Sequence, residues 1–171
     1  DLSVVNLKDR DFSGLDMTAV NLTNSNLAGT NFVDANLTGA TLTGAYLYGA
    51  NMVGANLSET NLVDAKLDGM DLTGANLSGA DLSGAYLNEA DLRGADLTGS
   101  DLTRIILVDT YLKGATIELR QFAKVYRCSK EIPDREEKLW IKMVQKIYEL
   151  YGKKEECKSK WGKSGLQDSQ L

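Results

Sequence analysis

Carboxylate and amide side chains recur at a fixed interval in residues 1–117, and they are the first candidates for chemistry. Asp or Asn occupies 17 of the 24 positions that directly precede a repeated apolar residue. Carboxylates on neighbouring turns of a coil would stack about 4.8 Å apart and could share a cation. Two such pairs are Asp71 with Asp91 and Asp81 with Asp101. A calcium site needs six or more oxygens, so we interpret these side chains as solvated carboxylates beside asparagine ladders and predict no metal site.

The residue types that catalysis and cofactor binding usually need are missing. The chain of 171 residues has no histidine, which removes the commonest general base and the commonest transition-metal ligand. The two cysteines have no imidazole partner, so a Cys–His nucleophile is excluded. The glycines fall at corners rather than in a phosphate-binding loop, and the glycine-rich nonapeptide that binds calcium in other β-solenoids is absent. We therefore predict that the protein is not an enzyme and uses no cofactor.

The two cysteines, Cys128 and Cys157, both lie outside the repeats. A disulfide between them would close a segment of 30 residues and contribute about 3–4 kcal/mol. The alternative is two free thiols in a reducing cytosol. Paired cysteines in the least repetitive segment favour the disulfide, and with it an oxidising compartment. Two cysteines without histidine would make a poor zinc site.

A five-residue period must position the carboxylate and amide side chains of residues 1–117. Every fifth residue from Leu2 to Ile117 is apolar, and 19 of these 24 centres are Leu. Residues five apart drift around an α-helix and alternate between the faces of a straight strand, so neither element can bury them together. A chain that turns once per repeat can do so, because each repeat then forms one short edge around a shared axis.

The other positions of the repeat fit such an edge. Ala occupies 12 of the 23 positions two residues before a centre, where the side chain points inward with the centre. The position directly before the centre (the outward position) points to solvent, and Ser or Thr follows the centre at 12 of 24 places. The position after that (the turn position) holds 13 of the 16 glycines, which suits a corner.

Phrases such as Ala80-Asp81-Leu82-Ser83-Gly84 and Ala95-Asp96-Leu97-Thr98-Gly99 resemble those of the pentapeptide-repeat proteins. The resemblance covers residues 1–117. It implies a right-handed quadrilateral β-helix in which four repeats complete one coil, so that 24 repeats make about six coils. Phe12 and Phe32, the two aromatic centres, lie four repeats apart and should stack on one face.

The most distinctive outward positions are also spaced by four repeats, which is one full coil. They hold Tyr46, Lys66, Tyr86 and Ile106 in place of Asp or Asn, and Tyr48 lies beside them. We name these five residues the tyrosine strip. Lys66 between two tyrosines would make cation–π contacts of about 0.5–1 kcal/mol each. The strip is either a partner-binding surface, since aromatics favour interfaces, or a set of β-forming residues that fit an exposed face.

Residues 118–171 form a separate carboxyl-terminal segment, predicted to be a helical cap with a flexible, polar tail. Residues 118–127 are predicted to form either a short helix or one further irregular coil. A clearer helix is predicted from Pro133-Asp134, with an apolar stripe at helical spacing. The stripe consists of Trp140, Met143, Val144, Ile147 and Tyr151. It is expected to dock on the end or flank of the column, with Ile106, Val108 and Tyr111 as its seat, or to pair with a second copy in an end-to-end dimer.

Charge divides unevenly between the two segments. Residues 1–117 carry 15 acids and six bases, whereas residues 118–171 carry nine acids and 13 bases. An acidic column argues against direct nucleic-acid binding. Its acidic residues either only keep the surface solvated or attract a basic partner. No apolar run is long enough to span a membrane. The chain begins at Asp1 within the repeat register and without Met, which suggests a processed product.

Three classes of function follow. We favour a non-catalytic scaffold, a rigid rod whose faces hold an unidentified protein partner, as a monomer or an end-to-end dimer. Members of the family that this chain resembles occur in cyanobacteria, some of them in the periplasm or thylakoid lumen. The resemblance therefore implies one of these compartments, which would agree with a disulfide. The alternative is that the protein is cytoplasmic. Other members of that family are acidic, mimic DNA and bind type II topoisomerases such as DNA gyrase. The resemblance therefore implies DNA mimicry as the second class of function. The third class, an enzyme, has no residue in its support.

Overall fold

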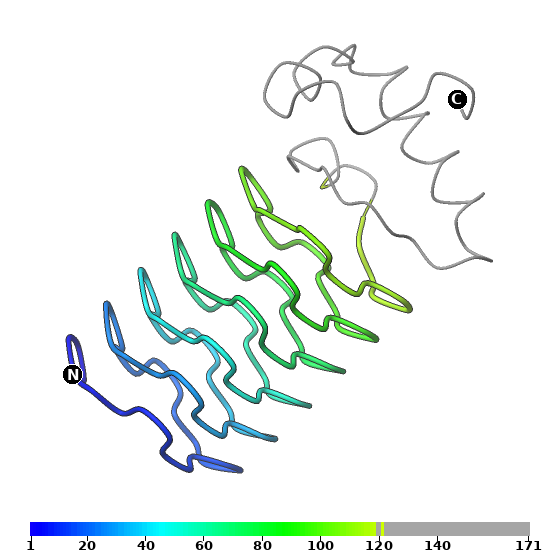
Figure 1. The fold of residues 1–171 in the computed structure, drawn as a ribbon. Coiled ribbons are helices and arrows are strands. Elements are labelled where there is room, and N and C mark those ends of the chain that lie inside the picture. The colour runs from blue at the N-terminus through cyan, green and yellow to red at the C-terminus, as the bar shows by residue number, and fades with distance from the viewer. Residues whose placement is uncertain (119–120, 122–171) are drawn as a thin grey trace, which may run out of the picture.

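The computed structural model describes residues 1–118 and Gln121, which wind into a column of stacked coils (Figure 1). Parallel pairing joins positions four repeats apart, from Asn6 with Asn26 to Asp96 with Thr116. Within residues 1–118 each pairing is a bridge of a single residue, and there is no helix or longer strand. The predicted coil of four repeats is therefore confirmed, and the described part is an all-β solenoid.

Each repeat turns a corner in the same way. In the first coil, the Arg10 N–H donates to the Leu7 carbonyl over 3.2 Å, and the turn position between them, Asp9, has a φ of 58°. A positive φ at the third residue of a four-residue turn favours glycine. Thirteen glycines adopt it, as do ten other residues, among them Val4 and Arg104. The prediction that glycine marks the corners is confirmed.

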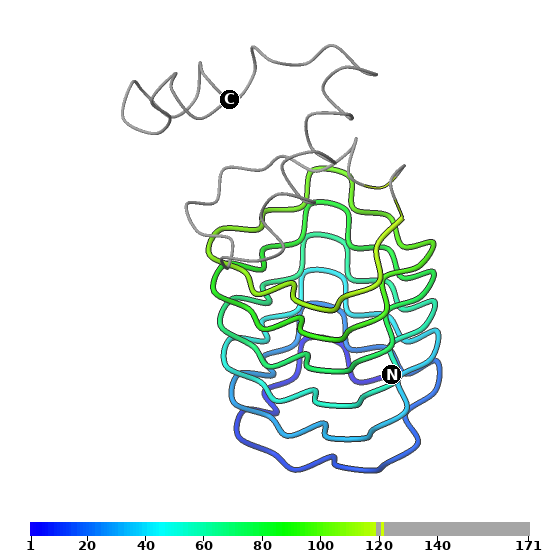
Figure 2. The same cartoon turned by 90° about the vertical axis from the view of Figure 1, so that its right-hand side faces the viewer.

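Backbone hydrogen bonds tie each coil to the next. Around one repeat, Leu27 N–H donates to the Tyr46 carbonyl at 2.7 Å and Gly29 N–H to the Tyr48 carbonyl at 3.0 Å, while Asn26 N–H donates to the Val5 carbonyl at 2.9 Å. The same three bonds recur from coil to coil, so the outline of the column repeats almost unchanged (Figure 2). This regular ladder supplies stabilisation that one Leu and one Ala per repeat could not supply alone.

The repeated apolar residues meet along the axis of the column. All centres from Leu22 to Leu107 are at most 4% exposed, and the inward alanines pack between them. The rings of Phe12 and Phe32 stack with centroids 5.2 Å apart, as their spacing predicts. In the first coil the apolar side chains are less covered, and Leu2 is 38% exposed. The core is thus a continuous rod of leucine and alanine.

Gln121 closes the last described coil. Its amide nitrogen donates to the carbonyls of Leu97 and Ser100, at 2.7 and 2.8 Å, and its oxygen accepts the Glu118 N–H at 2.6 Å. The repeat register would place Gln121 outward, yet it is 4% exposed. The reason is that the ladder would bring the Gln121 N–H to the Ser100 carbonyl, but this N–H donates to the Glu118 carbonyl at 2.9 Å instead. The Gln121 side-chain amide then supplies the donor that the Ser100 carbonyl needs.

Several predictions fall outside the described residues. They concern the Cys128–Cys157 disulfide, the helix that carries Trp140, Met143, Val144, Ile147 and Tyr151, and the form of residues 119–120 and 122–127. Gln121, which is described, is helical, as the short helix predicted for residues 118–127 requires. The predicted seat of that helix is described: Ile106 and Val108 are half-buried, and Tyr111 is 58% exposed.

Candidate functional site

Most outward side chains serve the backbone of their own repeat. At each of the 17 outward positions that hold Asp or Asn, the side-chain Oδ1 accepts the N–H of the residue two positions on, an arrangement known as an Asx turn. Asn56 Oδ1 accepts the Ser58 N–H at 3.2 Å, and Asp101 Oδ1 accepts the Thr103 N–H at 2.9 Å. This revises the interpretation of these side chains as merely solvated groups.

The hydrogen bonds also hold carboxylates in their charged form. The pKa of Asp96 is lowered from its ordinary value of 3.8, first by the hydroxyl of Thr98 and then by its N–H. The pKa of Asp16 is lowered in the same way by Thr18. For Asp91 the largest cause of the lowered pKa is the side chain of Arg93, which bonds the carboxylate through Nε and Nη2. The acidic columns are thus built to accept hydrogen bonds from the chain itself.

No group of three acidic or cysteine side chains in the described part of the chain is arranged to hold a metal ion. The predicted stacks do form, since Asp71 pairs with Asp91 and Asp81 with Asp101 across neighbouring coils. Each of these four carboxylates accepts a backbone N–H of its own Asx turn.

The tyrosine strip interrupts this pattern. Tyr46, Lys66, Tyr86 and Ile106 bridge one another in four successive coils, as their spacing predicts. None of these side chains has a carboxylate or amide oxygen, so none can form the Asx turn. In the repeat of Tyr86, a carboxylate from the preceding coil takes over the role of the Asx acceptor. The Asn88 N–H donates to Asp68 Oδ1 at 3.2 Å. The strip is therefore a place where the chain departs four times in succession from its own stabilising rule.

Two side-chain contacts organise the strip. The Lys66 ammonium lies 3.2 Å from the centroid of the Tyr86 ring, a cation–π contact. The rings of Tyr46 and Tyr48 stack nearly parallel, with centroids 6.4 Å apart and planes 19° apart. These two tyrosines are 47% and 58% exposed, so the pair presents aromatic surface to solvent. The sequence predicted the stacking of the strip but not the pairing of Tyr46 with Tyr48.

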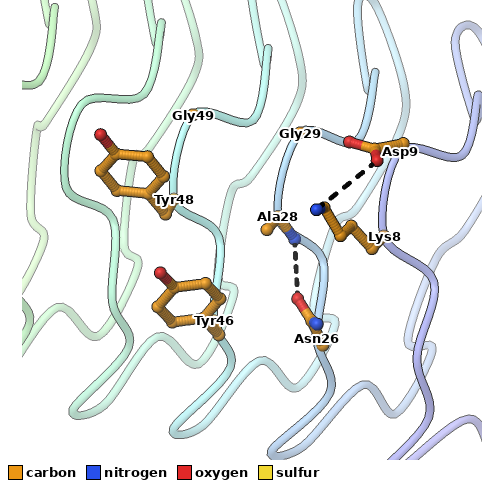
Figure 3. A pocket seen from close by; sticks show the side chains of 8 residues that line it. All are labelled: Lys8, Asp9, Asn26, Ala28, Gly29, Tyr46, Tyr48 and Gly49. Atoms are coloured by element: carbon orange, nitrogen blue, oxygen red, sulfur yellow. Dashed lines mark hydrogen bonds and ion pairs between the residues drawn. The ribbon is translucent and has the colours of Figure 1, made fainter.

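A hollow of about 440 Å³ adjoins the two exposed tyrosines (Figure 3). Ala28 and Gly29 lie in the coil between the tyrosines and the first coil, and their small size leaves the space open. The residues that line the hollow are Lys8, Asp9, Asn26, Ala28, Gly29, Tyr46, Tyr48 and Gly49. Lys8 and Asp9 form a long ion pair at 3.9 Å, with both side chains more than half exposed. The sequence reasoning missed this hollow, although Lys8, Ala28 and Tyr48 are spaced one coil apart and that spacing carries the signal.

A family profile described as pentapeptide repeats matches in five overlapping stretches. They are residues 1–39, 16–52, 40–79, 65–104 and 75–114. Together they cover residues 1–114, more than half of the chain. The chain belongs to the pentapeptide repeat family. The family assigned from the repeat phrases is thus confirmed, and the matched family is not a catalytic one.

This pentapeptide repeat protein is similar to several solved structures. The pentapeptide repeat protein Rfr23 of the cyanobacterium Cyanothece 51142 is 32% identical, with 64% of this chain and 85% of that chain covered and a TM-score of 0.37. A pentapeptide repeat protein of the Arabidopsis thaliana thylakoid lumen is 28% identical, with 66% and 71% covered and a TM-score of 0.36. QnrB1, a plasmid-mediated fluoroquinolone resistance protein, is 16% identical, with 82% and 86% covered and a TM-score of 0.28. A comparison with curated proteins gave no match.

No helix in the described residues has the length and apolar character needed to cross a bilayer.

Of the predicted site residues, the structure brings together the five members of the tyrosine strip on one face of the column. The predicted disulfide and the predicted helix face lie beyond the described residues.

Proposed function

We propose that this pentapeptide repeat protein is a non-catalytic scaffold that holds a protein partner on the face bearing the tyrosine strip. The observation that supports this proposal is the loss of the Asx turn at four successive outward positions of one face, against its use at 17 positions elsewhere. A hydrogen bond of this kind contributes about 0.5–1.5 kcal/mol to stability. Residues retained at such a cost are typical of binding surfaces, where function competes with stability.

The composition of the strip supports the same proposal. Tyrosine is enriched in the centre of protein interfaces because it offers a large, rigid contact area with a polar tip. Tyr46 and Tyr48 expose about half of their surface, and Tyr86 and Ile106 continue the same face in later coils. The regular backbone ladder beneath them keeps the face flat and preorganised, which lowers the entropy lost on binding.

Capture of partners from a lysate of the source organism tests the proposal. The test variants are Tyr46→Asn and Tyr86→Asn, because Asn is the residue that the repeat normally places there and each variant should fold. Tyr111→Asn is the matched control, since Tyr111 is an outward tyrosine on another face and is 58% exposed. We expect the partner captured by the parent protein to be lost from both test variants and kept by the control. A partner list unchanged by Tyr46→Asn and Tyr86→Asn would end the proposal.

The acidic charge of the column favours a second candidate function. Fifteen acids against six bases in residues 1–117 give a surface that could imitate the phosphates of DNA and bind a type II topoisomerase such as gyrase. A supercoiling assay decides this: inhibition of gyrase at micromolar protein supports mimicry, and full activity at that concentration excludes it. This function does not need the tyrosine strip, so Tyr46→Asn should leave any inhibition unchanged.

We also propose that the protein works in an oxidising compartment, the periplasm or thylakoid lumen, rather than in the cytoplasm. The two cysteines, Cys128 and Cys157, are the support for this proposal, because disulfides persist in such compartments. Titration of thiols in native protein without reductant should find none, and two titratable thiols would remove the argument. Sedimentation at several concentrations tests the accompanying proposal of a dimer formed through the carboxyl-terminal helices.

A further inference from the structure

We infer that the partner presents a proline-rich segment, with arginine or lysine at one end, which lies along the tyrosine strip in the polyproline II conformation. The inference rests on the proposed scaffold function and names the chemistry of what the strip would hold. It is supported by three independent features of the described residues: the spacing of the coils, the aromatic surface beside the hollow, and the carboxylates along one edge.

The spacing of the coils selects the conformation of the ligand. Neighbouring coils are about 4.8 Å apart, so equivalent positions two coils apart, such as Tyr46 and Tyr86, are about 9.6 Å apart. A polyproline II helix has three residues per turn and a rise of about 3.1 Å, and it therefore presents the same face about every 9.3 Å. An α-helix repeats at about 5.4 Å and one face of a strand at about 6.7 Å, so both lose register within two or three coils. A polyproline II segment stays in register over the whole strip.

The aromatic surface and the hollow suit proline rings. The rings of Tyr46 and Tyr48 stack nearly parallel, with planes 19° apart, and Ala28 and Gly29 line the hollow beside them. Figure 3 shows the two rings along one side of the hollow and Lys8 and Asp9 along the other. Aromatic-lined grooves bind proline-rich segments because the segment is already extended and loses little entropy on docking. One proline would pack on the tyrosine pair while the next turn of the ligand reaches the pair formed by Lys66 and Tyr86.

Charge along the edge of the strip favours a basic ligand. The turn positions on the edge next to Tyr48 hold three exposed acids, Asp9, Glu89 and Asp109, and three glycines. The opposite edge carries one acid, Asp64, and one base, Arg104. The ammonium of Lys66 is engaged with the Tyr86 ring, and Lys8 makes only a long, solvated ion pair with Asp9. The edge is therefore acidic beside the last coils of the strip, where Glu89 and Asp109 lie, whereas Lys8 offsets Asp9 at the first coil. This complements arginine or lysine at one end of a proline run.

The 171 residues contain one proline, Pro133, so they do not themselves supply a proline-rich run to the strip.

Fluorescence anisotropy of the full chain with a labelled peptide of two arginines followed by nine prolines tests the inference. We expect saturable binding, weakened at least tenfold by Tyr46→Asn, by Tyr48→Ser and by Ala28→Tyr, which would fill the hollow with the residue that stands one coil further on. Tyr111→Asn should bind within twofold of the parent protein. Replacing both arginines of the peptide by glutamate should also weaken binding at least tenfold.

The outcomes separate this inference from the proposed function. If a partner is captured through Tyr46 and Tyr86 but the proline peptide does not bind, the inference is wrong and the scaffold function stands. If the partner list is independent of both tyrosines, the scaffold function itself fails. Tyr46-dependent binding of cellohexaose without binding of the peptide would overturn the inference in favour of a sugar ligand, because sugar rings also stack on flat aromatic surfaces.

Discussion

Two faces of the same column use the outward position in opposite ways. One face holds Asp16, Asn36, Asn56, Asn76 and Asp96, which we name the amide column; each of its members forms an Asx turn. The other face carries the tyrosine strip in its third to sixth coils and has no Asx turn at its outward positions there. The inward residues of both faces are alike, since Leu47 and Leu57 are each fully buried.

The comparison separates what the fold needs from what it tolerates. The core and the ladder require an apolar centre and a turn, and they leave the outward side chain free to vary. The amide column uses that freedom to bond its own backbone, and in places to bond the next coil, as the amide of Asn76 does with Asn56 Oδ1 at 3.2 Å. The tyrosine strip uses it to present aromatic surface. A solenoid can therefore carry a binding face on a scaffold that its other faces stabilise.

The largest expected effect tests whether the two faces share one core. Leu47→Ala lies beneath the tyrosine strip and Leu57→Ala beneath the amide column, in the same coil and both at 0% exposure. Each is expected to lower the free energy of unfolding by about 2–5 kcal/mol, because each leaves a cavity in a packed axis. Urea denaturation measures both. If Leu47→Ala lowers the free energy of unfolding by less than half as much as Leu57→Ala does, the core beneath the tyrosine strip is loosely packed. The two faces would then not share one equally packed core.

A smaller effect is expected from the amide column itself. Asn56→Ala removes the acceptor for the Ser58 N–H and for the Asn76 amide, each at 3.2 Å. We expect a loss of about 1–2 kcal/mol in the free energy of unfolding. Asn56→Asp is the control, because a carboxylate keeps both acceptor bonds and should stay within about 0.5 kcal/mol of the parent protein. Equal losses in the two variants would mean that the Asx turn is not what the position contributes.

The converse change on the tyrosine strip should be slightly stabilising. Tyr46→Asn installs the acceptor that the repeat normally supplies, and it loses only a solvent-exposed ring contact with Tyr48. We expect the free energy of unfolding to rise by about 0.5 kcal/mol while partner capture is lost. A thermal melt beside the capture experiment measures both. A drop in stability of about 1 kcal/mol or more would show that the strip is a structural feature of the fold.

The smallest effect concerns pH and the acidic ends of the amide column. Because the folded pKa of Asp96 lies below its ordinary value of 3.8, the hydrogen bonds from Thr98 stabilise the fold fully above about pH 4. That contribution is lost as the pH falls from about 4 through the folded pKa. Asp96→Asn keeps an acceptor that does not titrate, so this variant should lose less stability between pH 6 and pH 3 than the parent protein. An identical loss in urea denaturation at the two pH values would contradict this.

The repeat pattern made most of the fold predictable. A strict period of five, with Leu at the centre and Gly at the turn, predicted the axial core and the corners with positive φ, and the resemblance to pentapeptide-repeat proteins implied the coil of four repeats. The stack of Phe12 on Phe32 and the column from Tyr46 to Ile106 followed because their members are spaced by four repeats, which is one coil. These features depend only on register, and a repeat without insertions fixes the register along its whole length.

The sequence by itself therefore determined the winding of the chain and which residues share a face. Only the tertiary structure decided how side chains on a face meet: Tyr46 beside Tyr48, Lys66 over Tyr86, the hollow above Ala28, and Gln121 turned inward onto Leu97 and Ser100. The physical reason is that register places Cα atoms, whereas rotamers and end effects depend on the size of the neighbours one coil away and on which backbone groups lack a partner.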